Sequence, residues 1–108
     1  MSELYERAFQ LIVSAGNAKS KAMLSAKAAR EFHFEEAKKL LEEAKKEFAD
    51  SHHIQTELLQ AEAAGEQHAV PLIMIHAQDH LTMAMMAQEN ASEFLGLYQM
   101  IYELKQAK

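Results

Sequence analysis

The sequence contains no cysteine and no tryptophan, and its 108 residues include only one proline and three glycines. Without cysteine the chain can form neither a disulfide nor a thiolate metal site, and it has no cysteine nucleophile. The scarcity of proline and glycine removes the residues that most often interrupt helices. The lack of cysteine also fits a reducing compartment, and we expect a cytoplasmic protein.

Long hydrophobic runs and an excess of positive charge are missing as well. No run of 18 apolar residues occurs, so the sequence predicts no membrane-spanning helix. The first ten residues, MSELYERAFQ, are acidic and amphipathic, unlike a signal peptide. The net charge is −5, and the basic residues alternate with acidic ones, as in EEAKKLLEEAKKEF. Nucleic acid is therefore not an expected partner, because phosphate contacts need clustered Lys and Arg.

What the sequence does contain is typical of helices: 49% of the residues are hydrophobic, and Ala, Glu, Lys, Leu, Gln and Met dominate. Apolar residues recur at helical spacing in three segments, from Ser2 to Arg30, from Phe34 to about Ala64 and from Pro71 to about Ala107. Short loops between long helices favour antiparallel neighbours. The sequence therefore predicts an all-α protein, an up-down-up three-helix bundle, with residues 1–108 forming a single domain.

The third predicted helix is apolar nearly all round. Its hydrophobic side chains are not confined to the side that two neighbouring helices would cover, and a helix of this kind is usually buried on all sides. An apolar patch of this size is unusual on a monomer. We therefore expect the chain to self-associate through its third helix.

Within this apolar helix, the stretch VPLIMIHAQDH carries His76, Asp79 and His80. The two histidines are four residues apart, so their rings lie on one helix face. This HxxxH spacing fits a zinc pair, a structural pair or a functional histidine, because neutral imidazole is a nucleophile near pH 7. Copies of Asp79 on a symmetry axis would repel one another unless protons or a cation neutralised them. The pattern alone leaves these alternatives open.

The remaining histidines are expected to be structural. His52 and His53 lie near Gln55 and Thr56 in the second predicted helix, which suggests a buried or interfacial polar network. His33 and His68 fall in the predicted loops.

Three stretches carry a resemblance to a known family: AFQLIVSAGNAKSKAM, SHHIQTELLQAEAAG and LIMIHAQDHLTMAM. Together they resemble the lactose/cellobiose-type IIA component of the bacterial sugar phosphotransferase system over nearly the whole chain. The resemblance implies a cytoplasmic homotrimer of three-helix subunits. It implies that a histidine accepts a phosphoryl group from the carrier protein HPr and passes it to a cysteine of the cognate IIB component.

By motif position, the resemblance assigns the phosphoryl acceptor to His76, the first histidine of HAQDH. It assigns to Asp79 the axial carboxylate that holds a divalent metal ion, Mg²⁺ being our expectation, between three subunits. His80 is expected to assist His76. The sequence departs from the family at the first loop, where Phe32, His33 and Phe34 replace the common Gly-Asp-Phe.

Two other functions remain as alternatives to the phosphoryl carrier. One is a helical bundle that binds a metal through His76, Asp79 and His80, and the other is a helical adaptor without chemistry. The sequence does not indicate which sugar is transported.

Overall fold

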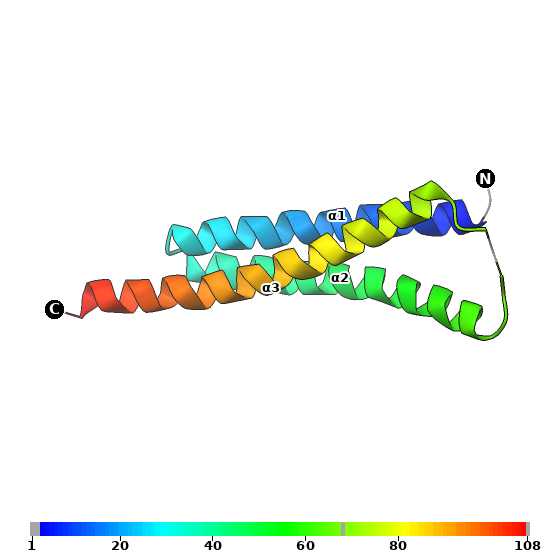
Figure 1. Cartoon of the computed structure of the whole chain (residues 1–108). Helices are drawn as coiled ribbons and strands as arrows, with labels where there is room; N and C mark the ends of the chain where they lie inside the picture. Colours follow the sequence, from blue (N-terminus) through cyan, green and yellow to red (C-terminus); the bar gives the residue numbers. More distant parts are fainter. Residues whose placement is uncertain (1–2, 68, 108) are drawn as a thin grey trace.

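The computed structural model describes residues 3–67 and 69–107, which form three helices: α1 Glu3–Arg30, α2 Phe34–Ala63 and α3 Leu72–Gln106. Figure 1 shows α1 and α3 running in the same direction with α2 antiparallel to both. The molecule is a rod, with principal extents of 63 × 24 × 19 Å. The predicted three-helix bundle is confirmed, and the predicted helix ends agree to within about one residue, except Ser2, which lies outside the described residues. α1 continues without a break through Gly16.

The core consists mainly of alanines, because α1 supplies small side chains wherever it meets the other helices. Fully buried alanines recur along α1, and α3 meets them with Ala77, Ala84 and Ala91. Leu11 is the largest apolar side chain that is fully buried. Small side chains allow helix backbones to approach closely, but each removes little apolar area from water. The interior of one chain therefore supplies only modest hydrophobic stabilisation for its length.

α1 ends in a Schellman motif whose left-handed residue is a phenylalanine. The His33 N–H donates to the Ala28 carbonyl and the Phe32 N–H donates to the Ala29 carbonyl, both at 2.9 Å. Phe32 has φ 65°, the conformation that favours glycine. Its ring contacts Tyr102 of α3 edge-on, with 5.3 Å between ring centroids. The departure from Gly-Asp-Phe thus places a bulky residue at the position where the turn needs a positive φ.

The second turn follows the expected pattern. Gly65, at φ 103°, follows the C-cap residue Ala64, and its N–H donates to the Glu62 carbonyl at 3.0 Å. Pro71 immediately precedes α3, so it caps the helix and lies just outside the first turn predicted for it. His33 lies in the first turn, as predicted, whereas the prediction for His68 concerns a residue outside the described ones.

α3 exposes much apolar surface, as its sequence predicts. Within the described ranges, no helix has the length and hydrophobicity needed to cross a membrane. The exposed large hydrophobic residues concentrate on α1 and α3, and α2 contributes only Leu59 among the residues described. On α3 they are Leu72, Ile75, Met83, Met85, Met86, Phe94, Leu97, Met100, Tyr102 and Leu104.

Candidate functional site

The candidate site occupies the first three turns of α3. Met74 and Ala77 anchor this segment, because both are buried in one cluster with Ala8 and Leu11 of α1. Residues three or four apart lie on one face of a helix, so Met74 and Ala77 share the buried face of α3. His76 is not on that face, and its side chain therefore points toward solvent. His76 is exposed, and His80 is half-buried.

The two imidazoles are in direct contact. The Nε2 atoms of His76 and His80 are 3.0 Å apart, and the rings meet edge-on, with 4.5 Å between centroids and an interplanar angle of 88°. At this distance one Nε2–H donates to the lone pair of the other Nε2. Which of the two rings donates depends on their tautomers. A zinc ion bound by both Nε2 atoms would need a wider gap, because each Zn–N bond is about 2.0 Å long and tetrahedral angles separate the ligands.

Asp79 is exposed and lies only about 60° round the helix from His76, but no hydrogen bond or ion pair joins it to His76 or His80. At about 100° per residue, its side chain leaves α3 about 100° round from that of His80. A shallow hollow of about 420 Å³ is lined by Asp79, His76, Leu72, Ile73 and Ile75. Within residues 3–67 and 69–107, no three His, Cys, Asp or Glu side chains gather closely enough to hold a metal ion. One chain therefore does not form the metal cluster of His76, Asp79 and His80 that the sequence left open.

Gln78, the remaining polar residue of HAQDH, joins α3 to α2. Its Oε1 accepts a hydrogen bond of 2.6 Å from Nε2 of Gln55, and its own Nε2 donates to Sδ of Met74 at 3.5 Å. The sequence did not predict this interhelical contact. It fixes the N-terminal part of α3 to α2 just behind the histidine pair.

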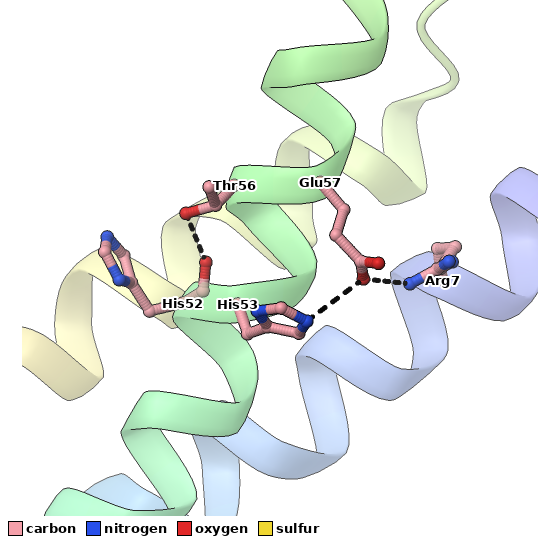
Figure 2. Close-up of polar contacts among 5 residues, drawn as sticks. All are labelled: Arg7, His52, His53, Thr56 and Glu57. Atoms are coloured by element: carbon pink, nitrogen blue, oxygen red, sulfur yellow. Dashed lines mark hydrogen bonds and ion pairs between the residues drawn. The ribbon is translucent and has the colours of Figure 1, made fainter.

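The prediction of a buried or interfacial polar network at His52 and His53 is wrong in its first half, because both side chains are exposed in the single chain; the interfacial alternative stays a prediction. Figure 2 shows the contacts that form instead: Oε1 of Glu57 lies 3.8 Å from Nε2 of His53 and accepts a hydrogen bond of 2.9 Å from Arg7. The His52 carbonyl accepts a hydrogen bond from Thr56. Asp50 and neighbouring polar residues interrupt the apolar stripe here, which turns this part of α2 toward solvent.

Comparison with known proteins identifies the family. The family "PTS system, Lactose/Cellobiose specific IIA subunit" matches residues 6–99. The chain belongs to this family. It is 44% identical over 105 residues to the lichenan-specific phosphotransferase enzyme IIA component of Bacillus subtilis, covering 97% of this chain and 96% of that protein. It is 38% identical to the lactose-specific EIIA component of Staphylococcus epidermidis, covering 83% and 86%.

Solved structures of the family have the same fold. The cellobiose-specific enzyme IIA from Bacillus anthracis superposes with a TM-score of 0.91 at 39% identity, covering 100% of this chain and 96% of that one. The IIA subunit of an Escherichia coli chitobiose-branch complex with HPr gives a TM-score of 0.78 at 29% identity, covering 94% and 99%. As a IIA component, the chain is a phosphotransferase component of the sugar phosphotransferase system. The adaptor without chemistry is therefore the wrong alternative.

Proposed function

We propose that this IIA component carries a phosphoryl group on His76 between HPr and its cognate IIB component. The observation that supports the proposal most directly is the exposed His76 ring, in contact with His80 at 3.0 Å and bordered by exposed apolar residues. A relay between proteins needs an accessible nucleophile and a docking surface, and it needs no deep pocket. Leu72 and Ile75, which are 80% and 50% exposed, supply apolar surface beside His76.

The reaction consists of two balanced displacements. An unprotonated ring nitrogen of His76 attacks the phosphorus of phospho-HPr, an N–P bond forms on His76, and the bond between phosphorus and the HPr histidine breaks. In the second step the cysteine thiolate of IIB attacks the same phosphorus, an S–P bond forms and the His76 nitrogen leaves. Phosphoryl transfer needs little covalent help from the protein beyond positioning and charge stabilisation.

His80 is the assisting residue in this proposal. It holds the His76 ring in one orientation, which lowers the entropy lost on reaching the reactive geometry. When His76 donates its Nε2–H to His80, the free lone pair of His76 lies on Nδ1. When His80 donates, the lone pair of His76 lies on Nε2 and becomes available once that hydrogen bond opens. The contact therefore couples the tautomer of His80 to the nucleophilic nitrogen of His76.

The active form is proposed to be a cytoplasmic homotrimer, with Asp79 of each copy facing the threefold axis. Asp79 fits a metal ion in the chemistry of its donor atoms: its carboxylate is exposed, no ion pair within the described residues engages it, and three copies would offer up to six oxygens. Oxygen ligands of this kind suit Mg²⁺. The ion would neutralise three converging carboxylates, and it takes no part in the transfer steps above.

Incubation of the protein with phosphoenolpyruvate, HPr and the enzyme that phosphorylates HPr tests the role of His76. The expected product carries an acid-labile, alkali-stable phosphate that is lost in His76→Gln. His53→Gln, an exposed histidine on α2, is the matched control and keeps the label. His80→Gln slows labelling without preventing it. Labelling of His76→Gln at the wild-type level, or no labelling of the wild type, would show that His76 is not the acceptor.

A further inference from the structure

The start of α3 has few local stabilising features. Pro71 occupies the N-cap position and makes no side-chain hydrogen bond to the helix, and the first turn has no acidic residue to complement the positive end of the helix dipole. Leu72, the first helical residue, is 80% exposed. A helix end of this kind depends on tertiary contacts to stay formed. His76 lies in the second turn, so its position depends on these contacts.

Gln55 supplies the polar part of these tertiary contacts. Its Nε2 donates the 2.6 Å hydrogen bond to Oε1 of Gln78, and within residues 3–67 and 69–107 no other hydrogen bond or ion pair joins α2 to α3. Both side chains are half-buried. Water competes less for such a bond than for one on the open surface. The bond therefore fixes α3 to α2 at one defined height.

This bond acts on the turn of α3 that carries the two imidazoles. Gln78 lies midway between His76 and His80 in the sequence, and at about 100° per residue its side chain leaves the helix about 160° round from each of them. The 3.0 Å contact between the imidazoles needs residues 76 and 80 to lie one regular turn apart. Holding Gln78 from the opposite side keeps this turn regular.

The part of α2 that presents Gln55 is itself held by the other helices. Leu58 packs against the buried cluster that contains Met74 of α3. Glu57 accepts the hydrogen bond from Arg7 that joins the same part of α2 to α1, as Figure 2 shows. The Gln55 donor is therefore presented to α3 from a fixed position.

We infer that Gln55 is a positioning residue for phosphoryl transfer, which acts through Gln78 on the turn that presents His76 and His80. This inference rests on the proposed relay at His76 and adds a residue of a second helix to it. Without the Gln55 donor, Oε1 of Gln78 loses its partner in a half-buried place, and the amide turns toward water. The reactive geometry of His76 then has to be reached without this bond, which slows transfer.

Single-turnover transfer from phospho-HPr tests the inference. Labelling followed by rapid quench, over a range of phospho-HPr concentrations, separates the limiting rate from the half-saturating concentration. Gln55→Leu should lower the limiting rate by about two- to tenfold, the worth of one hydrogen bond, and leave the half-saturating concentration unchanged, because the surface beside His76 is intact. Gln55→Glu should keep most of the rate, since the Gln78 amide can turn and donate its own N–H to the carboxylate.

Two control variants separate positioning from general stability. Glu57→Gln weakens the contact between the same part of α2 and α1, and it should leave the limiting rate unchanged. Ser25→Ala removes a buried hydrogen bond from α1 to the Ala37 carbonyl of α2, and it should also transfer at the wild-type limiting rate. Circular dichroism confirms that each variant is folded under the conditions of the assay.

The nitrogen chemical shifts of the imidazoles give a second readout, which a general loss of stability does not move in folded protein. These shifts report which ring nitrogen carries the proton. Gln55→Leu should change the Nε2 shifts of His76 and His80, because their contact opens more often. The shifts of His33, in the turn between α1 and α2, should stay unchanged.

Each outcome decides the inference. A Gln55→Leu protein with the wild-type limiting rate or unchanged imidazole shifts would overturn it, and so would a fall in rate that either control reproduces or that Gln55→Glu shows in full. If the wild type accepts the label and Gln55→Leu accepts it equally fast, the positioning role is refuted and the relay stands. If the wild type accepts no label, the relay is refuted, and the imidazole shifts still decide whether Gln55 holds the histidine pair.

Discussion

Replacing Phe32 by glycine should destabilise the protein, even though its φ of 65° is the conformation that glycine adopts most readily. The change relieves the backbone, since the left-handed conformation costs a residue with a side chain about 1–2 kcal/mol. It also deletes a ring that contacts Phe34 at 5.9 Å and Tyr102 at 5.3 Å between centroids. The Lys105 ammonium lies 5.3 Å from the centre of the same ring.

The lost contacts outweigh the relieved strain. Two aromatic pairs are worth about 0.5–1.5 kcal/mol each. The cation–π contact adds about 0.5–1 kcal/mol, and burial of half a phenylalanine adds about 1 kcal/mol. Glycine also gives the unfolded chain more freedom, which costs roughly 0.5–1 kcal/mol. The sum of about 3–6 kcal/mol, less the strain, leaves a net loss near 3 kcal/mol. Phe32→Ala keeps the strained φ and should be less stable than Phe32→Gly by about 0.5–1 kcal/mol.

Urea unfolding followed by circular dichroism, at one fixed protein concentration, measures both changes. The midpoint of Phe32→Gly should fall by roughly 1–3 M, and that of Phe32→Ala should fall further. Labelling of His76 should be unaffected in folded protein, because Phe32 belongs to the turn between α1 and α2, and Figure 1 shows this turn at the opposite end of the rod from the start of α3. A Phe32→Gly protein as stable as the wild type would refute the reasoning, since the aromatic cluster would then contribute no more than the strain.

Three further changes have expected outcomes. Gly65→Ala should lower the free energy of unfolding by about 1 kcal/mol, because φ 103° is unfavourable for alanine; a urea titration with no change would contradict this. Ser25→Ala should cost about 1 kcal/mol by the same assay, since the buried Ser25 hydroxyl donates a 2.7 Å hydrogen bond to the Ala37 carbonyl, whereas Ser20→Ala, at an exposed site, should cost less than 0.5 kcal/mol. Asp79→Leu should leave the assembly intact or more stable, because packing replaces converging like charges; dissociation measured by light scattering would instead make the metal ion the main stabilising contact.

The fold was predictable because local and global signals agree along the chain. Helix formers fill all three segments, Gly65 marks one turn, and short loops leave few topologies open. The turn at Phe32 could not be predicted in detail. A phenylalanine disfavours the left-handed backbone conformation that Phe32 adopts, and the Phe32 ring packs against Tyr102, a residue 70 positions away. Only the tertiary structure therefore reveals what stabilises this turn.

The candidate site was predictable in part. The spacing of His76 and His80 predicts that their rings share a face, and the structure confirms this with a contact of 3.0 Å. The Gln55–Gln78 hydrogen bond was not found, because no sequence rule states which residues of two helices lie at the same height. The exposure of His52 and His53 in the single chain was not predicted for a related reason, since no sequence rule states which face of α2 the other two helices cover.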